Sequence, residues 1–185
     1  MKKTLLALNL TGLLAYSASI SSCKKDDDKK PTPTLYDTLG GTTMVSDPAN
    51  TGKMIEKGRL GIRSVVDSTI FVIAADPALN TKFFSVLLGE VGSGNLTGFT
   101  NLSNRLTDFF CVATGAKNFT YGGMNMVDAH DPAKNARMGT KATSADFDQF
   151  VGDLVKGAKK CGLSDAVIGQ VGALVNTLRT QVVQK

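Results

Sequence analysis

Apolar side chains recur every three or four residues along most of the chain after residue 35, and this spacing predicts amphipathic helices. The pattern is clearest in four stretches, residues 54–77, 102–116, 144–163 and 164–183. Asp76-Pro77 is a stop signal for the first helix, and Gly115 and Gly162 end the next two. Ser144 and Ser164 are the predicted N-caps of the last two, because a serine side chain accepts a hydrogen bond from the first helical turn.

Three stretches rich in glycine, asparagine and proline separate these helices and are predicted loops: residues 40–52, 88–100 and 131–141. No segment alternates apolar and polar residues for long, which argues against a sheet. Residues 68–75 have the composition of a strand, but the helical spacing upstream favours a helix there. The pattern therefore predicts an all-α domain of four to six helices.

The first 23 residues, MKKTLLALNLTGLLAYSASISSC, have a basic start, an apolar middle and small residues before a cysteine, as in a secretory signal peptide. The apolar part is too short and too polar for a membrane span, which needs about 20 apolar residues. Residues 20–23 (ISSC) resemble a bacterial lipobox. This resemblance implies cleavage before Cys23 and a lipid on its sulfur, whereas the alternative is an ordinary secretion signal that contains a cysteine.

Residues 24–34 are charged and prolyl and contain no large apolar group before the domain, so they cannot form a core. We expect a signal peptide at 1–22, a disordered tether with lipidated Cys23 at 23–34, and a helical domain at 35–185. The expected location is the cell envelope, lipid-anchored at the outer membrane, its periplasmic face or the cell surface.

The formal net charge of +5 includes Lys2 and Lys3, which belong to the segment expected to be removed. The remaining charge is small and dispersed, so nucleic acid is not an expected partner. Cys111 and Cys161 lie among apolar neighbours and are expected to be free thiols, with a disulfide between them as the alternative that an oxidising compartment permits. Neither has a CxxC partner that would indicate a zinc or redox site.

His130 is the only histidine of the chain. On a helix, Met126 and Val127 would share its face. A single imidazole cannot hold a metal ion with protein ligands alone, whereas haem brings four nitrogens and needs one protein ligand. A lone histidine is nevertheless more often exposed or hydrogen-bonded than a ligand, so the residue pattern by itself does not select haem.

Five blocks of the sequence resemble group I truncated haemoglobins in their order and spacing, and they span most of residues 35–185. The blocks are LYDTLGG (35–41), AADPALNTKFF (74–84), DFFCVATGA (108–116), YGGMNMVDAH (121–130) and FDQFVGDLVKGAKKCGL (147–163). The resemblance implies a truncated globin-like two-over-two helical sandwich closed around haem b.

The resemblance also assigns roles to single residues. It makes His130 the iron ligand, with Met126 one turn before it. Phe83 or Phe84 matches the phenylalanine that packs on the porphyrin, and Tyr121 matches the aromatic residue at the start of the segment that carries the ligand. Glycines that let the chain turn sharply match at Gly40-Gly41 and in part at Gly115-Ala116.

This sequence departs from the family pattern in its loops and above the iron. Insertions follow Gly41, occur within residues 89–98, and follow His130. Ile70 stands at the usual tyrosine position and Leu106 at the usual glutamine position, with Leu102 one turn before it.

Bound dioxygen gains partial negative charge, and a hydrogen bond to it contributes about 1.5–3 kcal/mol. The apolar trio Ile70, Leu102 and Leu106 therefore implies weak oxygen binding and easy oxidation of the iron. A one-residue slip of the alignment would bring Thr69 or Thr107 into the pocket instead. Candidate cations for the haem propionates are Arg105, Lys117 and Arg137.

These observations favour a membrane-anchored haem protein that binds O2, CO or NO, rather than an enzyme, although nitric oxide or peroxide chemistry stays open. The alternative is a non-haem structural or interaction lipoprotein that retained the globin scaffold. A third hypothesis is a small helical enzyme that uses Asp128 and Asp131 near His130. On a helix, Asp128 would point elsewhere than His130, which disfavours that reading.

Overall fold

Helix α2 (Lys57–Ala75) has two apolar faces and is buried on both of them. Ile62, Val66 and Ile70 follow one another at four-residue spacing and pack toward helix α5 (Thr97–Ala113). Val65 points to the other side and joins the core beneath helix α7 (Ser144–Lys160). These helices belong to the part that the structure, a computed structural model, describes: residues 32–185.

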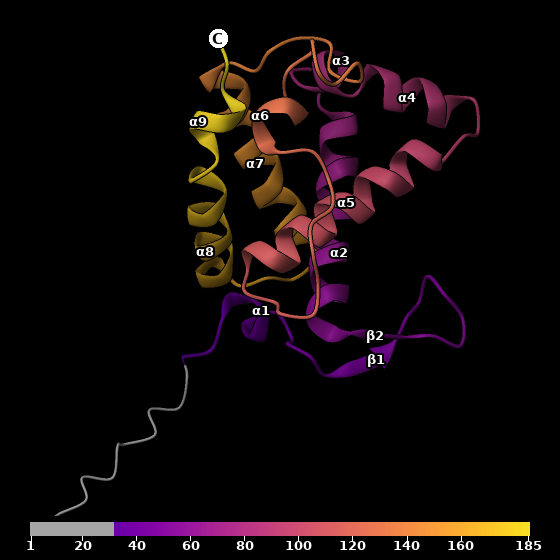
Figure 1. Ribbon diagram of the computed structural model, residues 1–185, viewed down its shortest axis with the longest axis vertical. Helices are drawn as coiled ribbons and strands as arrows, with labels where there is room; N and C mark the ends of the chain where they lie inside the picture. The colour runs from indigo at the N-terminus through magenta and orange to yellow at the C-terminus, as the bar shows by residue number, and fades with distance from the viewer. Residues whose placement is uncertain (1–31) are drawn as a thin grey trace, which may run out of the picture. The chain divides into compact units, whose positions relative to one another are not determined.

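Helix α7 also packs on helix α8 (Asp165–Asn176), so the pair α2 and α5 lies against the pair α7 and α8 (Figure 1). This is the all-α, two-over-two sandwich that the sequence analysis predicts. Short helices complete it: α1 (Leu35–Thr38), α3 (Asn80–Phe83), α4 (Ser85–Gly92), α6 (Met126–Ala129) and α9 (Arg179–Val182).

A small β-hairpin precedes α2, and the sequence analysis did not predict it. Strand β1 (Met44–Ser46) pairs antiparallel with β2 (Met54–Glu56) in the first insertion, where we expected a loop and then the start of the long helix. Strands of three residues are too short to show an alternating pattern. A long-range ion pair holds the hairpin to α2, with Nη2 of Arg63 at 2.6 Å from Oδ1 of Asp47.

Three other local predictions were wrong. The expected loop at 88–100 is largely helical, because α4 extends to Gly92 and α5 begins at Thr97. Thr143, rather than Ser144, is the N-cap of α7, and it forms a complete capping box with Asp146. The last predicted helix is two helices, since α8 ends at Asn176 and α9 begins at Arg179.

Several end signals are confirmed. Asp76 ends α2 and Ser164 caps α8. The backbone of Gly40 and Gly41 has φ of 127° and 59°, values that favour glycine, at the turn between α1 and the hairpin. Cys111 and Cys161 are free thiols, as expected.

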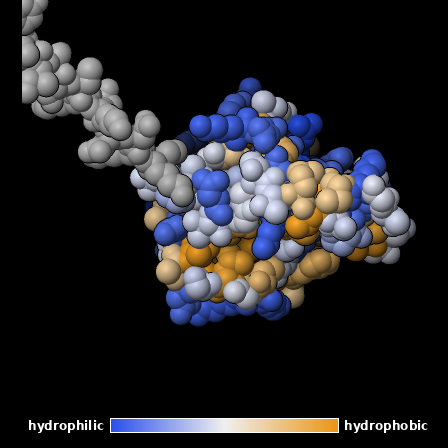
Figure 2. Space-filling view, turned by 90° about the horizontal axis from the view of Figure 1, so that it is seen from below, coloured by the Kyte–Doolittle hydropathy of each residue, from blue (hydrophilic) through white to orange (hydrophobic). Residues whose placement is uncertain are grey.

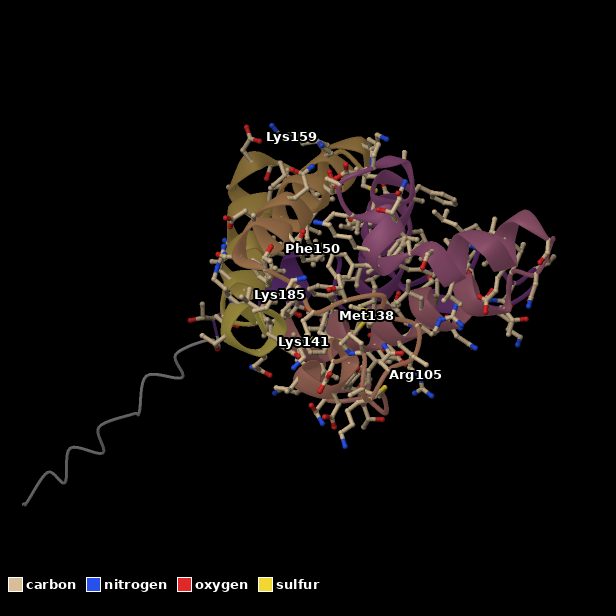
Figure 3. The ribbon with its side chains drawn as sticks, turned by 90° about the horizontal axis from the view of Figure 1, so that it is seen from above. Arg105, Met138, Lys141, Phe150, Lys159 and Lys185 are labelled. Carbon is tan, nitrogen blue, oxygen red and sulfur yellow. The ribbon has the colours of Figure 1, made fainter. Side chains whose placement is uncertain are left out.

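The two ends of the domain are tied to it differently. Thr34, the last residue of the predicted tether, caps α1 by accepting a hydrogen bond from the Asp37 amide. The signal peptide and Cys23 lie outside the described residues. At the other end, the Gln184 amide donates to the carbonyl of Ala142 at 2.9 Å, which ties the C-terminus to the loop that carries Lys141 (Figure 3).

The surface at the hairpin end mixes hydrophilic and hydrophobic residues (Figure 2). Single exposed apolar residues such as Met44 and Met54 are normal on a folded domain. Within residues 32–185, no helix combines the length and apolar character needed to cross a bilayer.

The crossing of α2 and α7 depends on a glycine. A Cβ atom on Gly157 would lie 2.9 Å from the backbone N and Cα of Thr69, so the helices approach too closely for a side chain. We expect Gly157→Ala to lower the free energy of unfolding by about 1–3 kcal/mol, measured by urea denaturation. Gly152→Ala is the matched control on the same helix, because nothing lies within 4 Å of its Cβ position. It should be neutral or stabilise by up to about 1 kcal/mol, and equal losses in both variants would contradict this packing.

Candidate functional site

A cavity of about 610 Å³ lies between the two helix pairs, below α6 and the segments that flank it. Its volume falls within the range of about 300–1,000 Å³ that is usual for small-molecule sites, and most of its lining is apolar. All eight residues that the sequence analysis assigned to a haem pocket line this one cavity: Ile70, Phe83, Phe84, Leu102, Leu106, Tyr121, Met126 and His130. Their contacts with a cofactor stay a prediction.

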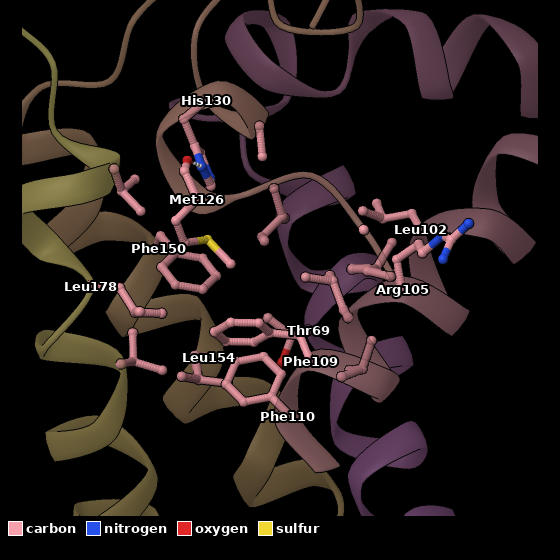
Figure 4. A pocket seen from close by; sticks show the side chains of 18 of the residues that line it. Thr69, Leu102, Arg105, Phe109, Phe110, Met126, His130, Phe150, Leu154 and Leu178 are labelled. Atoms are coloured by element: carbon pink, nitrogen blue, oxygen red, sulfur yellow. Dashed lines mark hydrogen bonds between the residues drawn. The ribbon is translucent and has the colours of Figure 1, made fainter. Parts of the chain in front are cut away.

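His130 ends the single turn α6, which Asn125 caps by accepting a hydrogen bond from the Asp128 amide at 2.9 Å. Nδ1 of His130 lies 2.8 Å from the backbone carbonyl oxygen of Met126 (Figure 4). Because a carbonyl only accepts, Nδ1 carries the proton and Nε2 keeps its lone pair. Histidines that bind metals commonly donate their other ring nitrogen in this way.

The surroundings of His130 favour the neutral form of its imidazole. Burial lowers the pKa of His130 below its usual 6.5, and the hydrogen bond to Met126 only partly opposes that effect. Figure 4 shows the ring directed from α6 toward the cavity, with Met126 and Phe150 beneath it. The site therefore offers one uncharged ring nitrogen to whatever occupies the cavity.

Aromatic side chains form much of the wall. Phe109 packs edge-on against both Phe110 and Tyr121, with ring centroids 5.4 and 5.3 Å apart. The hydroxyl of Tyr121 donates to the carbonyl of Met124 at 2.7 Å, so it is already satisfied. The sequence analysis did not assign Phe109 to the pocket. Its position seven residues after Leu102, on the same helical face, was the signal that could have found it.

At the positions considered on α2 and α5, no free hydroxyl donor lines the cavity, because the unpartnered hydroxyl of Thr107 lies outside its wall. Ile70 is buried, and Leu102 and Leu106 are half-buried, as partners in one apolar cluster. Thr69 lines the cavity, but its hydroxyl donates to the carbonyl of Val65 at 2.8 Å. Thr107 is fully buried and is not part of the cavity wall. A slip of the alignment by one residue would therefore not restore a donor.

The three candidate cations differ in their surroundings. Arg105 and Arg137 line the cavity, and Lys117 does not. Arg137 makes a bidentate pair with Glu90 at 2.8 and 2.6 Å, which lowers the pKa of that carboxyl. Arg105 is exposed and forms no salt bridge with another residue of the described part of the chain.

Asp128 and Asp131 do not support an enzyme centred on His130. Neither lines the cavity. Asp128 accepts a hydrogen bond from the Asn125 amide group at 2.7 Å, and Asp131 accepts one from the backbone of Ala133. Among residues 32–185, no three side chains of His, Cys, Asp and Glu gather closely enough to hold a metal ion.

The fold is that of the truncated, or 2/2, haemoglobins. Matching solved structures include the truncated hemoglobin from Tetrahymena pyriformis in its Fe(III) form and the 2/2 hemoglobin from Synechococcus sp. PCC 7002 in the cyanomet state with covalently attached heme. Each matches with a TM-score of 0.58 and 22% sequence identity, over 83% of this chain and 100% of the other. No protein-family model matches the chain, and no curated protein matches it in sequence. At this identity the likeness establishes the fold.

Proposed function

We propose that this protein is a haem-binding globin of the group I truncated type that binds a diatomic gas, O2, CO or NO, with Nε2 of His130 as the iron ligand. The single observation that carries the proposal is the placement of the His130 ring. It is fixed by the Met126 carbonyl and directed into a large apolar cavity. A bound haem supplies reversible gas binding at its iron.

The residues present fit haem b. Phe83, Phe84 and Phe109 offer apolar and aromatic surface to a flat ring. Cys111 and Cys161 do not line the cavity, so neither can form a thioether to the ring. Arg105 lies at the outer end of the cavity in Figure 4, where a guanidinium can bind a propionate.

Haem binding is tested by adding hemin to the purified full-length chain and recording the spectrum. We expect a sharp Soret band that saturates at one hemin per chain, and hemin should also raise the melting temperature. His130→Ala should lose the band and regain it with added imidazole, because free imidazole can replace the missing ligand. Val127→Ala is the control, since Val127 lies on the same turn, is exposed, and does not line the cavity.

Identical spectra for the wild type and His130→Ala would reject His130 as the ligand. The absence of a band with stoichiometric hemin would instead favour the alternative, a non-haem structural or interaction lipoprotein that retains the globin scaffold. A cavity of this size is unexpected in that case, because a protein interior without a ligand is normally closely packed.

The apolar side of the cavity predicts how tightly oxygen is held. We expect Leu106→Gln to slow oxygen dissociation about tenfold or more, because an amide donor contributes about 1.5–3 kcal/mol to a partly charged ligand. Carbon monoxide dissociation, measured by ligand replacement, should change far less. Leu106→Met is the control of similar volume without a donor and should leave both rates nearly unchanged. Equal oxygen off-rates in the two variants would place Leu106 away from the gas.

We further propose that the mature protein is anchored in the cell envelope by lipid on Cys23. The residues 20–23 (ISSC) support this, and they lie outside the described part of the structure. Gas sensing, nitric oxide or peroxide chemistry, or haem custody would suit such a location. A single acyl chain binds a protein to the membrane only weakly, whereas two or more acyl chains anchor it stably.

We expect Cys23→Ser to abolish incorporation of labelled fatty acid and to move the chain out of the membrane fraction. Cys161→Ser is the control, because Cys161 is a free thiol within the folded domain. Retention of Cys23→Ser in the washed membrane fraction would refute the anchor.

A further inference from the structure

We infer that the ion pair between Glu90 and Arg137 is a latch that controls how fast gas ligands reach the cavity. This inference rests on the proposed function, because it concerns access to the same site. The ion pair joins two segments at which this chain has insertions. One is the end of α4 with its following turn, and the other is the loop at 131–143. The residues of the pair lie 47 positions apart in sequence.

The pair lies where the cavity wall meets solvent. Arg137 lines the cavity, and its side chain is 46% exposed, while that of Glu90 is 25% exposed. Both guanidinium nitrogens of the fork are engaged, Nη1 at 2.8 Å and Nη2 at 2.6 Å from the carboxylate oxygens. The pair thus joins a cavity-lining residue, Arg137, to α4, and our proposal places the entry for gas beside it.

The Glu90–Arg137 pair packs against Gly98 of α5, and Gly98 also lines the cavity. A Cβ atom on Gly98 would be 1.8 Å from Oε2 of Glu90 and 2.5 Å from Nη2 of Arg137. The two charged groups therefore lie directly on bare backbone. Any side chain at position 98 would have to push the pair away.

The rest of the loop at 131–143 is held at its ends. Near its start, the Asn135 side chain donates to the carbonyl of Ala129 at 2.8 Å. Near its end, the Gly139 amide donates to the carbonyl of Lys82 at 2.9 Å. Between them, Arg137 provides the side-chain link from the loop to α4 within residues 32–185. Within the loop, Asn135 also accepts hydrogen bonds from the amides of Arg137 and Met138, which hold residues 135–138 together as a turn. In our proposal, this turn moves outward as a unit when the ion pair breaks.

An exposed ion pair is weak and is screened by salt, so it opens often. That property suits a latch for a small gas. The pair excludes larger molecules for most of the time, and each opening lets a diatomic ligand pass. Because the latch does not touch the bound ligand, it changes association and dissociation alike and leaves the affinity unchanged.

The experiment measures CO rebinding after flash photolysis of the haem-loaded full-length chain. Arg137→Gln, Glu90→Gln and Gly98→Ala should each raise the bimolecular rate about two- to fivefold, the factor expected for loss of one exposed pair. The exchanged pair, Glu90→Arg with Arg137→Glu, should restore the slow rate. Raising the salt concentration should speed rebinding in the wild type and not in Arg137→Gln. Lys159→Gln is the control, since Lys159 belongs to another exposed pair, with Asp165, and lies far from Arg105 and Met138 (Figure 3).

A second readout needs no haem. Amide hydrogen exchange of residues 133–138 should be faster in Arg137→Gln than in the wild type and slow again in the exchanged pair. A normal Soret band with unchanged rebinding rates in all three variants would overturn the latch and leave the haem proposal intact. Loss of the Soret band in His130→Ala is the separate test of haem ligation, so the two failures are distinguishable.

Discussion

Helix α2 must be buried on two faces at once, and the rest of the domain is arranged to satisfy that constraint. One face needs α5 and the other needs α7, and both partners bring their own apolar stripes. The close approach on the α7 side is possible because Gly157 has no side chain against Thr69. Farther along, phenylalanines and leucines of α5 and α7 line a space that these helices do not fill, and this space is the cavity.

The chemistry of the cavity follows from the small number of polar groups that line it. Burial alone would leave the ring of His130 neutral with its proton on either nitrogen, and the Met126 carbonyl selects Nδ1. The lone pair on Nε2 is then the one strong donor that the α6 turn presents to the interior. One such nitrogen is insufficient for a protein-ligated metal and sufficient for haem, so the scarcity of donors selects among cofactors.

The local parts of this fold could be predicted from the sequence, and the long-range parts could not. The stripe on α7 and the stop at Asp76 are local signals, and both were read correctly. The hairpin was missed because it is stabilised by Arg63, a residue outside its strands. For the same reason the three cations looked equivalent in the sequence. The structure separates them by pairing Arg137 with Glu90 and leaving Lys117 outside the cavity wall.

The role of His130 cannot be predicted from the local residue pattern alone. Its neighbours Met126 and Val127 describe a half-buried helical turn, which is compatible with many roles. The order of five separate blocks connects His130 with Phe83, Phe84 and Tyr121, and the structure places all of them around one cavity. Such convergence depends on packing between residues up to 47 positions apart, so a local signal cannot encode it.

Affinity and access are governed by different residues in this arrangement. In the proposed globin, Ile70, Leu102 and Leu106 would offer a bound gas no hydrogen bond, so we expect a low affinity for oxygen. Glu90 and Arg137 act on the barrier between solvent and cavity, and a barrier shifts both rates by the same factor without changing their ratio. A protein that needs to exchange gas with its surroundings, rather than store it, benefits from the first property. In our proposal, the second property limits how fast that exchange proceeds and makes it sensitive to ionic strength.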